Sequence, residues 1–545
     1  MKLIGELYQL QENHGYLREE DLKALAARLR VPLYRVEEVV SFFTHFRRSE
    51  PRKTEVAICR DLSCHLLQGH EYCSRVRELL DGDGDCDVHE VSCLGRCEYA
   101  PAALVNGTPV GRVSPEELAH RAKNAGKLPA VGLARPRRWR IDYCGERGER
   151  YAVYNEYRAA GDVDAAAADI IGTLKEAGLR GMGGAGFPTG LKWEIVRKES
   201  RTPKYVVCNA DESEPGAFKD RVIHEELPHL VIEGMCLAAF VTGAKQGYVY
   251  VRNEYEPERK AMQIALDDAR ARGVLGDGFD IEIFVSPGGY ILGEETALLE
   301  ALEDRRGEPR NKPPYPGQKG LWGRPTVINN VETLALAPAI LRHGADWWKA
   351  QGIRDHAGVK FIGVSGHVEN PGVFEIPLGT TVAELIAMAG GVIDGRALKA
   401  FAPGGASSKF LPANKAGVEI DFQTIADAGS MLGAAALVVV ADGTDMIETA
   451  ANVVRFFRNE SCGKCVPCRT GTEKVAQMLD AILAGKGDGA ILDALPSLET
   501  TLAETSICGL GQVALNPVVS ALEHWGKELT ARLDGQPGRN RGRGT

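Results

Sequence analysis

Residues 181–193 read GMGGAGFPTGLKW and place five glycines within ten residues, at Gly181, Gly183, Gly184, Gly186 and Gly190. A backbone without Cβ atoms can approach a ligand closely, so this loop is suited to cradling a phosphate or a ring. Three of these glycines fit a dinucleotide-binding fingerprint, but the preceding run DIIGTLKEAGLR (169–180) has the pattern of a helix and not of a strand. We therefore reject a Rossmann motif here and retain two interpretations, a ligand-binding loop beside Lys192 or a flexible turn.

On either side of this loop, strand-like and helix-like runs alternate. Residues 205–208 (YVVC) and 247–251 (GYVYV) predict strands, and the apolar run at 230–242 between them predicts a helix. This alternation is typical of a compact α/β domain, which we expect over residues 165–350.

Polar residues in this domain follow the predicted strand ends. Asp211, Glu212 and Glu214 come directly after YVVCNA, and Glu294 and Glu295 follow GGYILG. Such carboxylates can accept hydrogen bonds from ribose or ribityl hydroxyls, although a glycosidase acid pair, a divalent metal site or a solvated surface would use the same residues. Neutral donors and acceptors that suit a flavin ring are added by Asn329, Asn330 and Thr333.

The remaining patterns indicate several further domains, as expected for 545 residues at roughly 150 residues per domain. Strands at 54–58 and 87–92 flank a helix at 69–80, while 358–445 carries short β runs around one helix at 382–389. We predict a multidomain α/β protein with a helical bundle (1–50), an α/β domain (51–125), a linker (126–164), the α/β domain above (165–350), a small mixed β domain (351–445), a helical domain (446–535) and a disordered tail (536–545).

Eight of the 13 cysteines fall into two sets. Four residues separate Cys59 from Cys64 and three separate Cys93 from Cys97, which fits a [2Fe–2S] cluster better than tetrahedral zinc, whose pairs are usually two residues apart. In ESCGKCVPC, three cysteines at intervals of three residues are joined by a remote one, an arrangement that fits a [4Fe–4S] cluster, with zinc as the alternative. This second set is Cys462, Cys465, Cys468 and Cys508.

The other five cysteines are scattered, and we interpret them as buried or incidental thiols. They are Cys73, Cys86, Cys144, Cys208 and Cys236.

Charge and hydropathy exclude several classes of function. The net charge of −9, from 65 Lys and Arg against 74 Asp and Glu, removes the attraction that dominates nucleic-acid affinity. The longest apolar stretch, residues 431–441, has 11 residues and is too short to span a bilayer. The N-terminal MKLIGELYQL lacks the apolar core and cleavage site of a signal peptide. We therefore expect a cytoplasmic protein with no nucleic-acid partner and no membrane insertion.

Long, ordered stretches of the chain resemble the two electron-input subunits of respiratory complex I, fused into one polypeptide. Residues 1 to about 125, with CLGRCEYAPAALVNG, resemble the thioredoxin-like [2Fe–2S] subunit, and about 165–535 resemble the NADH-binding flavoprotein subunit. The flavoprotein stretches are GMGGAGFPTGLKW, NADESEPGAFKDR, GEETALLEALEDRRGEPR, RPTVINNVETLA and ESCGKCVPC. The resemblance also implies a β-grasp-like fold for 351–445 and [4Fe–4S] ligation by the second cysteine set.

This resemblance implies the cofactors FMN, NAD, [2Fe–2S] and [4Fe–4S]. It implies that the nicotinamide nucleotide stacks over the flavin near Phe187, Lys192, Glu214 and Glu295, where an acid would repel a 2′-phosphate and favour NAD over NADP. One departure is Met182, where complex I subunits usually carry arginine. The residues that match the FMN site are Gly181, Gly183, Lys192, Asn209, Asp211, Glu212, Ser213, Tyr290, Gly293, Glu294, Asn329, Asn330 and Thr333.

The implied activity is electron transfer between NAD(H), FMN and iron–sulfur clusters, so we assign no catalytic nucleophile or general base. The fusion resembles the diaphorase subunits of NAD-dependent formate dehydrogenases and NAD-reducing hydrogenases more than a typical complex I arrangement. We expect the β subunit of a molybdenum or tungsten formate dehydrogenase, bound to an iron–sulfur-rich catalytic α subunit. A hydrogenase or complex I partner is the first alternative, and a zinc-stabilised scaffold without redox chemistry is an alternative of a different class.

Overall fold

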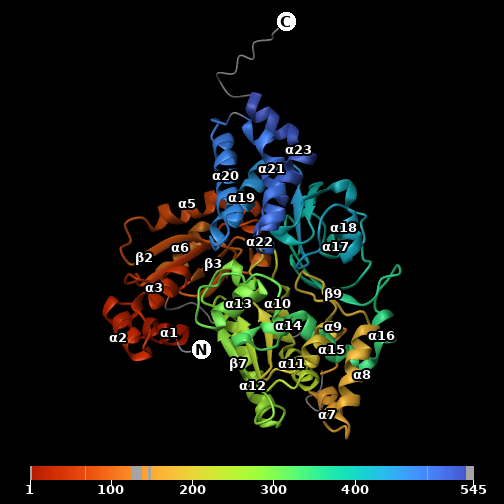
Figure 1. Ribbon diagram of the computed structural model, residues 1–545. Helices are drawn as coiled ribbons and strands as arrows, with labels where there is room; N and C mark the ends of the chain where they lie inside the picture. Colours follow the sequence, from red (N-terminus) through yellow and green to blue (C-terminus); the bar gives the residue numbers. More distant parts are fainter. Residues whose placement is uncertain (1–2, 68, 126–137, 145–148, 488, 535–545) are drawn as a thin grey trace.

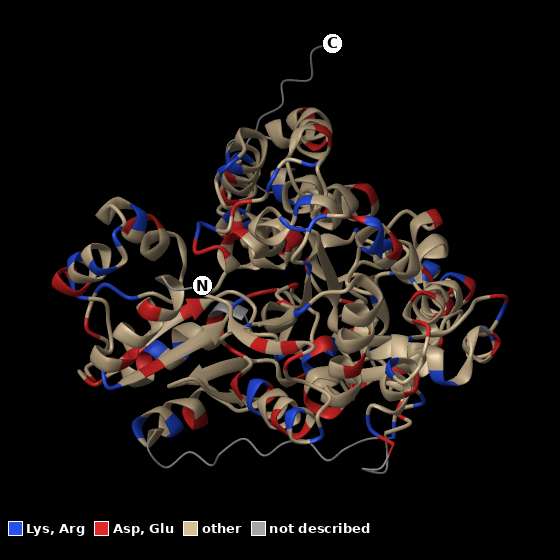
Figure 2. Ribbon diagram, turned by 60° about the horizontal axis from the view of Figure 1, so that its bottom comes forward, with Lys and Arg blue, Asp and Glu red and all other residues tan. Residues whose placement is uncertain are grey.

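The computed structural model describes residues 3–67, 69–125, 138–144, 149–487 and 489–534. In Figure 1 the part of the chain up to residue 125 lies to the left, the central domain lies below, and the last helices stand at the top. The predicted tail at 536–545 lies outside the described residues. Acidic and basic positions are interspersed along the elements in Figure 2.

The central domain is built on a parallel sheet of four strands in the order β7-β6-β5-β8. Alternate residues of a strand face opposite sides, and here both sides are buried. Val206 packs with helices α11 and α15, while Val207 belongs to a second buried cluster that includes residues of α13. The strands are β5 (Tyr205–Ala210), β6 (Gln246–Val251), β7 (Asp280–Val285) and β8 (Thr326–Asn330).

Helices α11 and α15 pack so closely that the contact depends on a glycine. A Cβ atom at Gly234 of α11 would lie 2.1 Å from the carbonyl oxygen of Leu334 in α15. The helices of this domain are α7 (Ala152–Arg158), α8 (Val163–Glu176), α9 (Thr189–Lys198), α10 (Lys219–Glu226), α11 (Pro228–Thr242), α12 (Glu256–Ala271), α13 (Glu295–Leu302), α14 (Pro316–Lys319), α15 (Val331–His343) and α16 (Ala345–Lys349).

The N-terminal part has three helices followed by a four-stranded sheet in the order β2-β1-β3-β4. Strand β1 runs parallel to β2 and antiparallel to β3, as expected of a thioredoxin-like domain. The elements are α1 (Leu3–His14), α2 (Glu19–Leu29), α3 (Leu33–Phe42), β1 (Thr54–Cys59), α4 (Ser63–Leu67), α5 (Gly69–Leu80), β2 (Cys86–Val91), β3 (Ala102–Val105), β4 (Thr108–Gly111) and α6 (Pro115–Lys123).

The predicted small β domain is a five-stranded sheet in the order β10-β9-β13-β11-β12. Most of the apolar stretch 431–441 lies in β13, in which every residue is buried. In the described part of the chain, no helix is long and apolar enough to cross a membrane. The elements are β9 (Val359–Gly366), β10 (Gly372–Pro377), α17 (Val382–Met388), β11 (Leu398–Ala402), β12 (Leu411–Pro412), α18 (Phe422–Asp427) and β13 (Ala436–Ala441).

The C-terminal part is helical, as predicted. Helix α19 packs against both α20 and α23, and α20 packs against α21. The helices are α19 (Met446–Glu460), α20 (Val466–Leu483), α21 (Ala490–Thr505), α22 (Gly509–Val513) and α23 (Asn516–Asp534).

The segment 126–164 differs from the linker that the sequence suggested. Its described part is packed, because Trp139, Ile141 and Tyr151 are all buried against the central domain. Trp139 also donates a hydrogen bond of 2.8 Å from Nε1 to Glu226. Arginine and proline content suggested a solvated connector, but the aromatic residues between them cover the domain's core.

Candidate functional site

Several of the predicted ligand-binding residues meet at the carboxyl edge of the central sheet. Asn209 at the end of β5 lies in register with Asn330 at the end of β8. The Asn209 amide donates a hydrogen bond of 2.9 Å to the carbonyl oxygen of Gly293, which brings the 290–295 segment to the same edge. Parallel strands present their carboxyl ends at one edge, where ligands of open α/β sheets bind.

The glycine-rich loop lies beside this edge. A Cβ atom at Gly183 would come within 2.9 Å of Cβ of Asn330, so only glycine allows this approach. The backbone N–H of Met182 donates a hydrogen bond of 2.8 Å to Oγ1 of Thr333. Met182 itself is buried, so it places an apolar side chain where a family arginine was expected. Phe187 at the end of the loop is exposed.

Some predicted cofactor ligands hold the framework of the site together. Both carboxylate oxygens of Glu212 accept backbone N–H groups, at 3.0 and 3.1 Å, in the first turn of α10. Asn329 accepts a hydrogen bond of 2.9 Å from the indole of Trp193. The Lys192 ammonium donates to the carbonyl oxygen of Ile328 at 2.9 Å. Burial lowers the pKa of Lys192, and nearby Glu295 opposes this effect.

The three acids after β5 are buried, and burial raises the pKa of each carboxyl group. Burial raises the pKa of Asp211 to about 6, although Arg252 and the hydroxyls of Ser213 and Ser286 oppose it. Burial and the charge of Asp220 raise the pKa of Glu212 to about 8.

Glu214 is held by hydrogen bonds from two neighbouring side chains and a backbone N–H. Its two oxygens accept hydrogen bonds from Tyr290 Oη at 2.7 Å and from the N–H and Oγ of Ser407 at 2.6 and 2.9 Å. Burial raises the pKa of Glu214 to about 7, against the lowering effect of these donors.

The residues present fit a flavin nucleotide. A glycine-lined loop, an ammonium group, amides and carboxylates lie around one sheet edge, and they match a ligand that carries a phosphate, hydroxyls and ring carbonyls. When bound, the flavin exchanges electron pairs with nicotinamide and single electrons with iron–sulfur clusters. The chain's own residues supply position and electrostatics around it.

In the first cysteine set, Cys59 ends β1, Cys64 lies in α4, and Cys93 and Cys97 follow β2. All four thiols are buried, and the sulfur atoms of Cys93 and Cys97 lie 3.5 Å apart. The backbone N–H of Gly95 points at Cys93 Sγ at 3.4 Å. Contacts with Cys59 and Cys97, the Arg252 charge and this N–H hold the pKa of Cys93 well below its usual range. Contacts with Cys93 raise the pKa values of Cys59 and Cys97 well above their usual range, so among these three thiols only Cys93 favours the thiolate.

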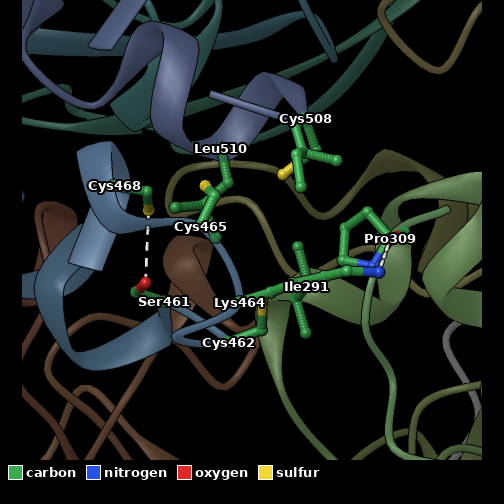
Figure 3. Close-up of a pocket in the computed structure, with 10 residues that line it drawn as sticks. Ile291, Pro309, Ser461, Cys462, Lys464, Cys465, Cys468, Cys508 and Leu510 are labelled. Carbon is green, nitrogen blue, oxygen red and sulfur yellow. Dashed lines mark hydrogen bonds between the residues drawn. The ribbon is translucent and has the colours of Figure 1, made fainter. Parts of the chain in front are cut away.

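The second cysteine set lines one small pocket (Figure 3). Cys465 occupies the N-cap position of α20. Burial raises the pKa of Cys468 to about 11 and that of Cys508 to about 12, so iron binding displaces protons here. The pocket is lined by Ile291, Pro309, Ser461, Cys462, Lys464, Cys465, Cys468, Ile507, Cys508 and Leu510.

Two residues that the sequence analysis missed connect these sites. Glu460, directly before the ESCGKC cysteines, accepts hydrogen bonds from the hydroxyl of Ser92 and from the N–H of Tyr290. Arg252 donates to the carbonyl oxygens of Cys93, at 2.7 Å, and of Glu212, at 2.8 Å. Arg252 directly follows a predicted strand at the same edge as Asp211, and that position was the available signal.

Family models match four parts of the chain. Residues 1–124 match the thioredoxin-like [2Fe–2S] ferredoxin, 174–339 the Nuo51 FMN-binding domain, 361–410 the SLBB domain, and 448–532 the iron–sulfur binding region of NADH-ubiquinone oxidoreductase-F. An NADH-quinone oxidoreductase subunit of Rhizobium meliloti (strain 1021) is 44% identical over 67% of this chain and 89% of its own length.

The chain belongs to the family of complex I-type NADH-binding flavoprotein subunits, fused to a thioredoxin-like [2Fe–2S] domain.

Other relatives of this NADH-binding flavoprotein are hydrogenase subunits. The NADP-reducing hydrogenase subunit HndC of Solidesulfovibrio fructosivorans is 42% identical over 67% of this chain and 76% of its own length. A chain in the crystal structure of an air-oxidised NAD⁺-reducing [NiFe]-hydrogenase superposes with a TM-score of 0.86, at 31% identity, over 97% of this chain and 93% of that one.

The comparisons confirm several predictions made from the sequence. The flavoprotein is an oxidoreductase subunit with FMN, NAD, [2Fe–2S] and [4Fe–4S] as its cofactors. The multidomain α/β architecture is confirmed, with the β-grasp-like part matched by the SLBB model. Zinc was the alternative for both cysteine sets, and the family models identify both regions as iron–sulfur regions instead.

Proposed function

We propose that this flavoprotein is the NAD(H)-side subunit of a multisubunit cytoplasmic oxidoreductase, and that a partner subunit converts the terminal substrate. The observation that supports this most directly is the convergence at Glu460. Its carboxylate links the loop of Cys93 through Ser92, the flavin-site segment through Tyr290, and the chain that enters the [4Fe–4S] motif. One carboxylate thus links segments of all three predicted redox sites and holds them close to one another.

We further propose that the residues predicted for FMN and NAD act as binding residues at the sheet edge. Gly183, Asn209 and Asn330 surround the edge, and Lys192 supplies a positive charge near the exposed ring of Phe187, whose centroid lies 6.0 Å from the ammonium nitrogen. Lys312 pairs with both Glu294 and Glu295, at 2.9 and 3.4 Å, and fixes these acids at the mouth of the site.

The proposed catalytic partner is a molybdenum or tungsten formate dehydrogenase subunit. The fusion of the two input modules in one chain fits this partner, and it fits a hydrogenase partner equally. A hydrogenase partner is a second candidate, because a chain of an NAD⁺-reducing [NiFe]-hydrogenase is similar to this chain over 97% of its length.

Anaerobic purification of the tagged flavoprotein with its bound partners distinguishes these candidates. NAD reduction with formate alone, together with molybdenum or tungsten in the complex, supports the formate dehydrogenase. NAD reduction with hydrogen alone supports a hydrogenase partner and contradicts the formate dehydrogenase partner. Oxidation of NADH by an artificial acceptor, with neither substrate active, contradicts both partner proposals and leaves the NAD(H)-side role standing.

A further inference from the structure

Arg252 occupies the boundary between the [2Fe–2S] domain and the flavin site. It is 5% exposed and directly follows β6. One guanidinium nitrogen donates to the carbonyl oxygen of the cluster ligand Cys93 at 2.7 Å, and the other donates to the carbonyl oxygen of Glu212 at 2.8 Å. A single buried cation therefore ties the loop of a cluster ligand to the loop that follows β5.

A neighbouring aromatic side chain fixes the orientation of this guanidinium. The Arg252 guanidinium carbon lies 5.2 Å from the ring centroid of Tyr255, and the Tyr255 hydroxyl donates to the same Glu212 carbonyl oxygen at 3.2 Å. Gly95, between the cluster ligands, also packs against this ring. A cation–π contact together with two carbonyl acceptors suits the guanidinium of arginine better than the ammonium of lysine.

The carboxylate of Glu254 forms an ion pair with Arg252. Glu254 lies 2.8 Å from the Arg252 guanidinium, and its side chain is 15% exposed. Burial would raise the pKa of Glu254, but Arg252 and His45 outweigh burial and hold that pKa well below its usual range. His45 comes from the N-terminal helical part, with Nε2 at 3.7 Å from Glu254. Glu254 is therefore a fixed negative charge beside a fixed positive one.

Arg252 and Glu254 differ in their contact with the cluster ligand Cys93. Arg252 contacts the Cys93 backbone, whereas no contact joins Glu254 to any of the four ligands among the hydrogen bonds and ion pairs of the described residues. The reduction potential of an iron–sulfur cluster depends on nearby net charge, hydrogen bonding and exposure. A buried cation stabilises the added electron, and a nearby anion weakens that effect.

We propose that Arg252 is a positioning residue that docks the Cys93 loop on the flavin site, and that the Arg252–Glu254 pair sets the reduction potential of the [2Fe–2S] cluster. This inference rests on the cluster assignment and not on the identity of the catalytic partner. Arg252 raises the cluster's potential, and Glu254 lowers it.

A redox titration of the purified full-length flavoprotein, followed by the EPR signal of the [2Fe–2S] cluster, tests the proposal. Arg252→Gln shifts the midpoint to lower potential and Glu254→Gln shifts it to higher potential. We expect each variant to change the equilibrium constant for cluster reduction about tenfold, which is about 59 mV for a one-electron couple. Shifts of opposite sign cannot come from general loosening of the fold.

Two further variants separate charge from docking. Arg252→Lys keeps the charge but cannot reach both carbonyl oxygens, so we expect a potential near that of the unaltered chain with a lower unfolding temperature. Arg270→Gln is the matched control, because Arg270 also bonds a carboxylate and a carbonyl oxygen, of Asp280 and Ile281, at the opposite end of the sheet. We expect Arg270→Gln to leave the midpoint potential of the [2Fe–2S] cluster unchanged.

The proposal is overturned if Arg252→Gln and Glu254→Gln shift the midpoint in the same direction, or if neither shifts it. If Arg252→Gln does not fold, the proposal is tested by the other two variants: by the sign of the midpoint shift in Glu254→Gln and by the midpoint potential of Arg252→Lys. A lower potential in Glu254→Gln, or a large negative shift in Arg252→Lys, contradicts the proposal.

Discussion

The carboxylate of Glu460 accepts a hydrogen bond of 2.9 Å from the backbone N–H of Tyr290. The other oxygen of Glu460 accepts from Ser92, next to the predicted [2Fe–2S] ligand Cys93, and the chain then enters the predicted [4Fe–4S] motif. Tyr290 in turn donates through its hydroxyl to Glu214. Three segments that are distant in sequence are thereby fixed relative to one another.

Replacing Glu460 by alanine tests this junction. We expect the free energy of unfolding to fall by about 1–3 kcal/mol, because the Tyr290 N–H and the Ser92 hydroxyl lose their acceptor. Chemical denaturation of the purified chain measures the change. Glu473→Ala on α20, where the side chain is 46% exposed, is the control and should change stability by less than about 0.5 kcal/mol. Equal effects of the two variants would contradict a joining role for Glu460.

Gly95→Ala tests the docking of the [2Fe–2S] domain. Gly95 has a φ of +65°, and a Cβ atom there would lie 2.1 Å from the Tyr255 hydroxyl. Gly107 in the same domain has a φ of +78° with open space around it. Gly107→Ala therefore introduces the backbone strain of a positive φ without a side-chain clash. We expect Gly95→Ala to be less stable than Gly107→Ala by about 1–3 kcal/mol, measured by thermal unfolding. Equal stability of the two variants would show that Tyr255 does not constrain this position.

Glu214→Gln tests the buried acid. Burial raises the pKa of Glu214 from 4.5 to about 7, so between these values the folded chain binds a proton that the unfolded chain does not. The contribution of Glu214 to stability is therefore full below pH 4.5, falls as pH rises, and is lost above about pH 7.

The raised pKa of Glu214 corresponds to a change of about 3 kcal/mol in the free energy of unfolding between pH 4.5 and 7. We expect the stability difference between the unaltered chain and Glu214→Gln to decrease from pH 4.5 to 7, as measured by denaturation at several pH values. Glu282→Gln, at an exposed strand position, should show no such trend. A difference that grows with pH would mean that Glu214 is ionised in the folded chain.

Cys465→Ser tests the assignment of the [4Fe–4S] site. We expect NADH to bleach the flavin absorbance as before, while reduction of the partner's acceptor is lost, because the altered site no longer relays electrons. Stopped-flow absorbance and steady-state turnover of the complex measure the two steps. Cys144→Ser, outside both cysteine sets, should leave both steps unchanged. Unchanged onward transfer in Cys465→Ser would contradict the assignment.

Local sequence patterns were sufficient to predict the elements and ligand sets that depend on neighbouring residues. The helix at 69–80 and the strands around it follow from periodicity, and the cysteine spacings identify both cluster regions. Contacts between distant segments could not be predicted in this way. Arg252 meets Cys93 across 159 residues, and Tyr290 meets Glu460 across 170, so both depend on how finished domains dock.

The 139–158 region shows a second limit of sequence patterns. Its proline- and arginine-rich surroundings suggested a solvated linker, yet Trp139 and Tyr151 are buried. Composition averages over a window, whereas a few aromatic side chains with a matching apolar surface are enough to order a segment. Similarly, Glu212 and Asn329 suggested ligand contacts, but the structure shows that they also hold α10 and Trp193 in place.

Anaerobic titration of the purified chain with NADH tests the central claim most directly. We predict that NADH bleaches a bound flavin and that EPR signals of one reduced [2Fe–2S] and one reduced [4Fe–4S] cluster appear. Iron and sulfide analysis should match one cluster of each kind per chain. A chain that lacks flavin and iron, or one whose clusters stay oxidised while the flavin bleaches, would contradict electron transfer from NADH to the clusters.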